Sequence, residues 1–207
     1  IDKIIKAQRI AEKGFAHMLD FIKVGRTEKE IQLELDYYML KNGAEALSFD
    51  TIALSGSNTS LPHGVPSDKK VESGEFVLMD FGGTYDGWHS DMTRTVCVGK
   101  PSDKMKSVYE TVLNAQLSAL DAVKAGMSGK ELDKIARDII TDAGYGDNFG
   151  HSLGHGVGVE IHESPYASPS REDILPQNSI VTVEPGIYLE GKFGVRIEDF
   201  VVVTENG

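Results

Sequence analysis

The chain has 207 residues, of which 40% are hydrophobic, and a formal net charge of -11 at pH 7. This length allows one sizeable hydrophobic core or two closely fused halves, and the acidic balance argues against a nucleic-acid-binding surface, which needs clustered Lys and Arg. No apolar run approaches the roughly 20 residues that span a bilayer. The only cysteine, Cys97, cannot form an intramolecular disulfide. We therefore expect a cytoplasmic protein that binds neither membranes nor nucleic acid.

Two helices are predicted at the start of the chain. Residues 4–24 carry apolar side chains at helical spacing and are followed by Gly25, a typical residue for a helix C-terminus. Thr27 and Glu30 then form a capping box, which predicts a second helix that stops near Gly43. The chain is thus expected to begin with a helical pair.

The same helical pair is predicted again further along the chain. Residues 108–124 form an amphipathic segment that ends at Gly126, and a capping box at Ser128 and Glu131 opens a helix that ends at Gly144. The two pairs align at a constant offset of 101 residues, which places Gly25, Thr27, Lys29, Glu30, Ile31 and Gly43 on Gly126, Ser128, Lys130, Glu131, Leu132 and Gly144. We interpret this as an internal repeat of approximately residues 1–100 and 101–207, although unrelated α+β segments can also be slid into partial register.

Strands that end or begin beside an acidic residue follow each helical pair. Residues 75–80 and 179–184 are apolar runs that each end in a carboxylate, and residues 93–98 and 197–203 are β-rich segments with an acid near their start. The four acids are Asp80, Glu184, Asp91 and Glu198. Glycine-containing connections at 82–87 and 191–194 are predicted to be hairpin turns. Two such α+β halves, facing each other about a pseudo-twofold axis, would bring four carboxylates together.

A glycine-rich segment provides a histidine as the fifth candidate ligand. His151, His155 and His162 are spaced by four and seven residues, and neutral imidazole is a common metal ligand. Four carboxylates and one imidazole are too many for one tetrahedral zinc site, and they suit two hard or borderline divalent ions. Such a donor set admits manganese, cobalt, iron or zinc. Any one of the acids alone could equally form a buried salt bridge.

Two further residues have both a structural and a functional interpretation. His63 lies in a loop between Pro62 and Gly64, where it is either a plain turn residue or a substrate contact. Arg196 precedes Glu198 by two residues and would project from the same strand face, so it either orients the metal-binding carboxylates or forms an ordinary ion pair. A serine-hydrolase elbow of the form Gly-x-Ser-x-Gly does not occur in the sequence.

Taken together, these motifs resemble the metallo-aminopeptidases of pita-bread fold, which include methionine aminopeptidase, aminopeptidase P and prolidase. The resemblance spans essentially the whole chain, and residues 154–158, 183–188 and 196–199 are similar to the Xaa-Pro branch. It implies a single α+β catalytic domain over residues 1–207, with a curved antiparallel sheet and two pseudo-twofold-related halves. Complete members of this branch usually carry an N-terminal domain and can form homodimers, so we expect this chain to be part of a longer protein.

The resemblance also implies an activity and a role for each motif residue. The expected reaction is hydrolysis of the peptide bond between an N-terminal residue and proline, in a peptide with a free N-terminus. Two divalent ions, with Mn²⁺ favoured, would be bound by Asp80, Asp91, His155, Glu184 and Glu198. Glu184 would transfer protons, His162 would stabilise the oxyanion, and His63 would contact the substrate at the scissile bond. His151 would line the substrate side, and Arg196 would lie behind the ligands.

Three alternatives share this fold. Methionine aminopeptidases usually lack the Arg-Ile-Glu-Asp run that this sequence has at residues 196–199. Pita-bread domains that have lost catalysis and bind peptides or proteins typically lose metal ligands, and creatinase-like hydrolases do not share the metal centre. All five ligand motifs are intact in this chain, which favours the Xaa-Pro peptidase.

Overall fold

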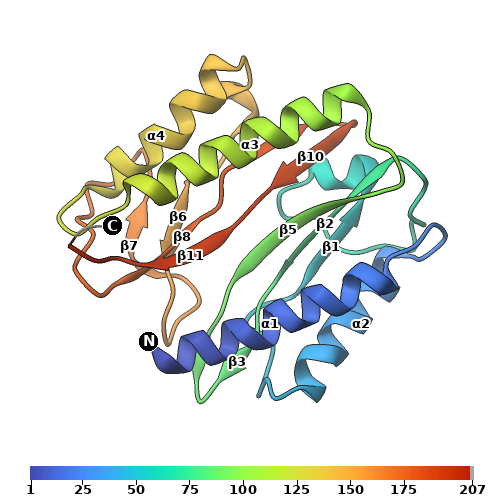
Figure 1. Ribbon diagram of the computed structural model, residues 1–207, viewed down its shortest axis with the longest axis horizontal. Coiled ribbons are helices and arrows are strands. Elements are labelled where there is room, and N and C mark those ends of the chain that lie inside the picture. The colour runs from blue at the N-terminus through green and yellow to red at the C-terminus, as the bar shows by residue number, and fades with distance from the viewer. Residues whose placement is uncertain (206–207) are drawn as a thin grey trace.

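Two α+β halves lie side by side in the molecule, one formed by the N-terminal and one by the C-terminal part of the chain (Figure 1). The computed structural model describes residues 1–205. The first half contains α1 (Asp2–Phe21), α2 (Glu28–Lys41), β1 (Ile52–Ser55), the 3₁₀ turn η1 (Gly56–Ser60), β2 (Glu75–Phe81), β3 (Thr84–Tyr85), β4 (Trp88–His89) and β5 (Met92–Val98). The second contains α3 (Asp103–Ala122), α4 (Gly129–Asp142), η2 (Gly146–Asn148), β6 (Gly154–Gly156), β7 (Glu163–Ala167), β8 (Ile180–Val183), β9 (Gly186–Leu189), β10 (Phe193–Arg196) and β11 (Asp199–Val202).

Three of the four α-helices, α2, α3 and α4, begin at a residue whose side chain accepts a hydrogen bond from a backbone N–H of the first turn, whereas α1 has no side-chain cap. Both predicted capping boxes are confirmed, at Thr27 for α2 and at Ser128 for α4. The helix predicted over 108–124 begins five residues earlier, at Asp103, because the Ser102 hydroxyl accepts a hydrogen bond from the Met105 N–H and caps that end. The first helix ends at Phe21, before the predicted 24, and the chain turns through Gly25 at a φ of +92°.

Removal of the cap on α4 should cost stability without affecting the rest of the fold. In Ser128→Ala the Glu131 N–H loses the hydroxyl acceptor that lies 3.3 Å away. We expect the free energy of unfolding to fall by about 1 kcal/mol, measured by urea denaturation with an unchanged m-value. Lys134→Ala, which removes an exposed ion pair with Asp138 on the same helix, is the matched control and should change stability by less than about 0.5 kcal/mol. Equal losses in the two variants would contradict the capping role of Ser128.

The strands are antiparallel, as expected, and form two main sheets and two hairpins. The order is β1-β2-β5 in one sheet and β11-β8-β6-β7 in the other, while β9 pairs with β10 and β3 with β4. The predicted turn at 82–87 is wrong in extent, because Thr84–Tyr85 pairs with Trp88–His89 and only Asp86 and Gly87, both with positive φ, make the turn. The second predicted turn is likewise shorter than 191–194, since β10 already begins at Phe193.

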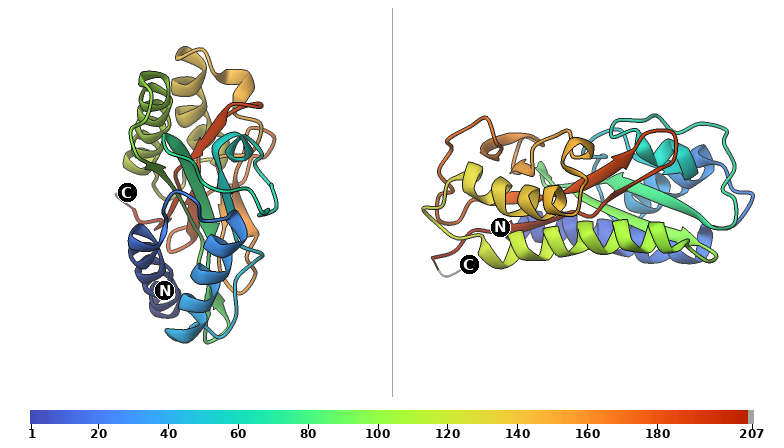
Figure 2. Two further views of the ribbon diagram at one scale, coloured as in Figure 1. Left: turned by 90° about the vertical axis from the view of Figure 1, so that its right-hand side faces the viewer. Right: turned by 90° about the horizontal axis from the view of Figure 1, so that it is seen from above.

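The two halves meet along a seam between β5 and the segment that joins β10 to β11. Across it, the Glu198 N–H donates to the Thr93 carbonyl at 3.1 Å, and the Thr95 hydroxyl donates to the Arg196 carbonyl at 2.9 Å. In the view from above, α1 and α3 lie along one face of the strands (Figure 2). Because each half also buries its own apolar cluster, the acids at the strand ends are carried on two packed units that face one another.

Within residues 1–205, no helix combines the length and the apolar character that crossing a membrane requires.

Candidate metal centre

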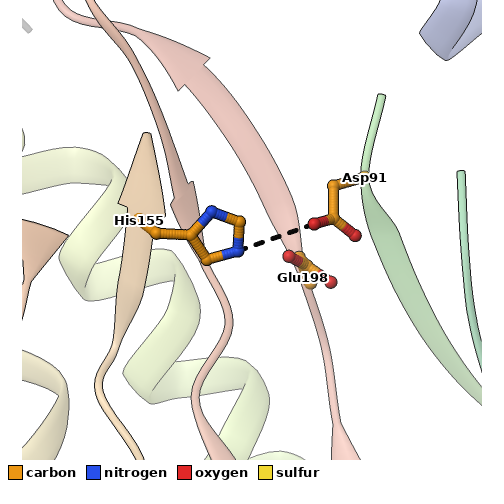
Figure 3. A group of neighbouring side chains, drawn as sticks. All are labelled: Asp91, His155 and Glu198. Atoms are coloured by element: carbon orange, nitrogen blue, oxygen red, sulfur yellow. Dashed lines mark ion pairs between the residues drawn. The ribbon is translucent and has the colours of Figure 1, made fainter. Parts of the chain in front are cut away.

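The five candidate ligands come from both halves and converge at the seam. Asp80 lies near the end of β2, His155 is the middle residue of β6, and Asp91, Glu184 and Glu198 flank strand ends. Figure 3 shows the side chains of Asp91, His155 and Glu198 pointing toward one another. One ligand atom from each of these three lies within 4.8 Å of the others. His155 Nε2 is 3.6 Å from Asp91 Oδ2 and 3.5 Å from Glu184 Oε1.

The acids of this cluster are buried, and their protein partners do not compensate for the loss of solvation of so many ionised carboxylates. Asp91 and Glu198 are 4% and 1% exposed. Burial, together with the neighbouring carboxylates, raises the pKa of both well above the usual value, and burial raises the pKa of Glu184 to about 8. Several buried carboxylates at such short range cannot all ionise without added positive charge. Divalent cations would supply it.

The two carboxylate oxygens of Asp80 differ in their partners. Arg196, itself 3% exposed, donates from Nη2 to Asp80 Oδ2 at 2.5 Å. Asp80 Oδ1 is buried and receives no hydrogen bond from residues 1–205. A buried carboxylate oxygen without a donor is costly, so this atom has the property expected of a metal ligand.

The His155 ring is held in the protonation state that metal binding requires. Its Nδ1 lies 3.0 Å from the Gly156 carbonyl, which only accepts hydrogen bonds, so Nδ1 carries the proton. Burial lowers the pKa of His155 to about 4, with a further contribution from His162. The neutral ring therefore presents the lone pair of Nε2 to the carboxylates. The chemistry of this donor set fits a divalent metal.

Glycine at position 154 allows His155 to reach this position. A Cβ at Gly154 would lie 1.9 Å from the Thr182 carbonyl oxygen on the adjacent strand. The close approach lets β6 pair with β8 and places the His155 N–H 3.0 Å from the Thr182 hydroxyl. That hydroxyl in turn donates to Glu184 Oε1 at 3.3 Å, so two ligands share one orienting residue.

Arg196 lies behind the ligands, where it contacts Asp80 directly and Glu198 only through Thr93. Besides Asp80, it donates from Nε to the Thr93 hydroxyl at 3.1 Å, and that hydroxyl donates to Glu198 Oε2 at 2.7 Å. It also donates from Nη1 to the Tyr188 hydroxyl at 2.7 Å. Arg196 thus supports one acid on each half of the molecule.

A cavity of about 370 Å³ opens onto the cluster and includes the three other motif histidines. The His162 ring packs 4.2 Å from the His155 ring, centroid to centroid. His151 lies 2.8 Å from the Tyr188 hydroxyl, and burial lowers its pKa to about 4. Within residues 1–205, neither the His162 ring nor the His63 ring has a hydrogen-bond partner, although both line the cavity. Their ring nitrogens are free to contact a ligand.

Sequence reasoning missed the apolar and aromatic walls of this cavity and one residue behind it. Phe49, Ile52 and Tyr166 line the cavity, and Tyr188 links His151 to Arg196. Phe49 and Tyr166 stand in segments without a chemical motif, so no local signal indicated them. Tyr188 closes the Glu-Pro-Gly-Ile-Tyr motif that Glu184 opens, and its place in the same motif as a candidate ligand is the sequence signal that could have indicated it.

Buried carboxylates gathered around one neutral imidazole form a donor set that suits divalent metal ions. The chain belongs to metallopeptidase family M24, whose family model matches residues 2–205. The Xaa-Pro dipeptidase of Pyrococcus furiosus is 50% identical over 207 residues, covering 100% of this chain and 60% of that protein.

Solved structures with the same fold agree with this assignment. The X-Pro aminopeptidase of Thermotoga maritima MSB8 superimposes with a TM-score of 0.97 at 52% identity, covering 100% of this chain and 58% of that one. An Xaa-Pro dipeptidase of Bacillus anthracis gives a TM-score of 0.98 at 50% identity, with 100% and 58% coverage. These superpositions confirm the expected pita-bread α+β fold. The chain spans about three fifths of the length of these relatives.

Divalent metal should stabilise the protein, and more so at higher pH. In the metal-free protein Glu184 has a pKa of about 8 against an ordinary 4.5, so the folded state binds this proton more tightly than the unfolded chain. Its contribution to stability is therefore present at low pH and is lost as the pH rises toward 8. Metal replaces such protons, so its stabilising effect should increase over the same range.

The measurement is thermal unfolding of chelator-treated protein with and without Mn²⁺. At an ion concentration of about 100 times Kd we expect the Tm to rise by roughly 5–10 °C near pH 8, and by less near pH 6. Mg²⁺-free buffer with EDTA alone is the control. A Tm that does not respond to Mn²⁺ at either pH would contradict metal binding at this cluster.

Proposed function

We propose that this chain carries the catalytic machinery of an Xaa-Pro peptidase, which hydrolyses the bond between an N-terminal residue and proline. The observation that carries the proposal is the convergence of buried acids from both halves on a neutral imidazole, beside a buried Asp80 oxygen that has no donor among residues 1–205. The names of the relatives, Xaa-Pro dipeptidase and X-Pro aminopeptidase, support proline as the residue after the scissile bond.

Two divalent ions would be held by the five ligands. Asp91 and Glu198 would be shared between the ions, Asp80 would bind one of them, and His155 and Glu184 would bind the other. When bound, the ions supply Lewis-acid activation of water and of the scissile carbonyl. The predominance of oxygen donors favours Mn²⁺, while Co²⁺, Fe²⁺ and Zn²⁺ remain compatible with the donor set.

Glu184 is the residue proposed to move the proton. Its Oε1 accepts the Thr182 hydroxyl hydrogen bond and lies closest to His155, which leaves Oε2 for proton transfer. Oε2 would accept a proton from the attacking water and deliver it to the proline nitrogen as the bond breaks. Burial already makes this carboxyl a stronger base than an exposed glutamate, because it raises the pKa.

The three cavity histidines that are not metal ligands are proposed to bind the substrate. The His162 ring, packed against His155, would donate a hydrogen bond to the oxyanion that forms at the scissile carbonyl. His63 would contact the peptide at the scissile bond, and His151 would line the pocket in an orientation fixed by Tyr188. The acidic cluster favours the protonated amino terminus of the substrate, and the walls at Phe49 and Ile52 offer apolar surface for side chains.

The test compares cleavage of an Xaa-Pro dipeptide, an Xaa-Pro-Yaa tripeptide and a Met-Ala-Yaa peptide by Mn²⁺-loaded protein. Expected is hydrolysis of an Xaa-Pro substrate with kcat/KM at least about 10-fold above that for the Met-Ala peptide, a difference of about 1.4 kcal/mol. Equal or faster turnover of Met-Ala would assign the methionine aminopeptidase reaction instead. Metal binding and peptide binding without turnover of any peptide would assign an inactive binding domain.

A further inference from the structure

Glu28, the first residue of α2, carries a fully buried carboxylate that none of the reactions above uses. Its Oε1 accepts from the Ser55 N–H at 2.7 Å and from the Ser55 hydroxyl at 3.1 Å. Its Oε2 accepts from the Ser67 N–H at 3.0 Å and from the Ser67 hydroxyl at 2.6 Å. The Asn58 amide donates to both oxygens, at 3.0 and 3.2 Å. A buried carboxylate with this many donors is fixed in one orientation.

The donors to Glu28 stand at the two ends of a single loop. Ser55 is the last residue of β1, and Ser67 lies beyond the loop's far end. Between them run residues 56–66, called here the His63 loop. One carboxylate therefore ties the two ends of the loop together, and Asn58 fixes its 3₁₀ turn from within. The loop cannot shift at either end without breaking hydrogen bonds to a buried charge, which is costly.

The tip of the loop has few restraints of its own. The neighbours of His63 include Leu61 and Val65, which are 51% and 82% exposed, so these two side chains add little packing at the tip. Since the His63 ring has no hydrogen-bond partner within residues 1–205, its place at the cavity follows from the loop backbone alone. The loop is held to the second half by three hydrogen bonds. The Thr59 hydroxyl accepts from the Gly194 N–H at 2.8 Å, the Ser60 hydroxyl accepts from the Gly191 N–H at 3.3 Å, and Arg196 Nη1 donates to the Pro62 carbonyl at 3.5 Å.

We infer that Glu28 is a positioning residue of the active site, which acts on the substrate through His63. This inference rests on the proposed function, because it takes His63 as a substrate contact. A carboxylate suits this buried position because several hydrogen-bond donors converge on it. It is further stabilised there because the N-terminus of α2 places the positive end of the helix dipole beside the negative charge.

The test is a double-mutant cycle between Glu28→Gln and His63→Ala. Glutamine preserves the shape but replaces one oxygen by an amide group that cannot accept the hydrogen bonds of Ser67 or Ser55. Because small displacements of a substrate-contacting group cost up to about 100-fold, we expect Glu28→Gln alone to lower kcat/KM on an Xaa-Pro peptide by roughly 10- to 100-fold. In the His63→Ala background the same change should lower it by less than about 2-fold, since the residue it acts through is gone.

A matched control lies on the same helix end. Glu30→Gln disturbs the capping box, in which Glu30 accepts from the Thr27 N–H at 2.8 Å, but makes no contact with the His63 loop. It should lower the Tm slightly and leave kcat/KM within about 2-fold of wild type. Mn²⁺ affinity should be the same in Glu28→Gln as in wild type, because none of the metal ligands contacts Glu28.

Backbone amide hydrogen exchange tests whether Glu28 anchors the loop, independently of whether the protein is an Xaa-Pro peptidase. Glu28→Gln should increase exchange over residues 56–66 and leave the strands that carry the metal ligands protected. If Glu28→Gln does not fold, Ser67→Ala removes the 2.6 Å hydroxyl contact to Glu28, together with the hydrogen bond that this hydroxyl accepts from the Lys69 N–H at 3.1 Å, and should show the same pattern at smaller amplitude. If wild type cleaves no Xaa-Pro peptide, the proposed function fails, and the exchange result alone decides whether Glu28 anchors the loop.

Three results would overturn the inference. The first is an equal loss of activity in the wild-type and His63→Ala backgrounds, which would make Glu28 a general stability residue. The second is unchanged activity in a folded Glu28→Gln variant. The third is wild-type activity of His63→Ala, which would leave no route from Glu28 to the substrate. Unchanged exchange over residues 56–66 in a folded variant would contradict the anchoring of the loop itself.

Discussion

Replacement of Asp91 by asparagine is expected to remove most of the bound metal and nearly all peptidase activity. Asp91 is 4% exposed, and its Oδ2 is 3.6 Å from His155 Nε2 at the centre of the cluster. Changes to residues that merely support a metal ligand cost roughly 10–100-fold in metal affinity or activity, so the loss of a shared ligand should exceed about 100-fold. Asparagine keeps the shape but loses the negative charge that a divalent ion requires.

The measurement is metal content by elemental analysis, together with kcat/KM at saturating Mn²⁺. The Asp91→Asn variant should remain folded, because removal of one buried negative charge relieves repulsion from Asp80 and Glu184 in the metal-free state. Asp86→Asn is the matched control, since Asp86 lies in the neighbouring turn and pairs with Lys3 at the surface. Full metal occupancy and wild-type turnover in Asp91→Asn would exclude Asp91 as a ligand.

Replacement of His162 by alanine should have a different signature, with a large loss of kcat and no loss of metal. Its ring lines the cavity beside His155 and has no hydrogen-bond partner within residues 1–205. Removal of one oxyanion donor typically lowers kcat by about 10²–10³-fold. We expect that reduction for His162→Ala, with KM changed much less, since the hydrogen bond strengthens as the oxyanion forms.

The control for this variant is a histidine outside the cavity. His17 pairs with Glu34 at 2.6 Å on the surface of the helical pair α1 and α2, so His17→Ala should retain wild-type kcat. Metal content of His162→Ala has to be measured as well, because its ring packs against a proposed ligand. Near-wild-type kcat in metal-replete His162→Ala would refute the oxyanion role, and loss of metal would instead indicate that the ring supports His155.

Local sequence signals were sufficient for the elements that depend on neighbouring residues. The capping boxes at Thr27 and Ser128 fixed two helix starts, because a side chain three residues away satisfies the same backbone groups in any fold. Ser102 caps α3 without a Glu or Gln three residues later, so its sequence signal is weaker than a capping box, and the predicted start of this helix lies five residues too late. The short strands β3 and β4 could not be recognised, since two-residue strands are defined only by their pairing.

The identities of the candidate ligands were also readable from the sequence, because a buried acid at a strand end needs a partner wherever it lies. Asp80, Asp91, Glu184 and Glu198 were selected on that basis, and the repeat suggested that they face one another. The sequence alone could not show that Asp91, His155 and Glu198 approach within 4.8 Å. That proximity depends on the packing of two halves against each other.

Only the tertiary structure identifies the residues that orient the site. Tyr188 and Thr93 became relevant only when folding placed their hydroxyls beside Arg196, and Phe49 and Ile52 only when the cavity closed around them. Glu28 is the clearest case, since its position in a capping sequence predicts an ordinary exposed acid in the first turn of a helix. Its burial follows from the loop that folds over it, 27 to 39 residues away in sequence. Local patterns therefore determine which residues can do chemistry, while long-range contacts determine where those residues are held.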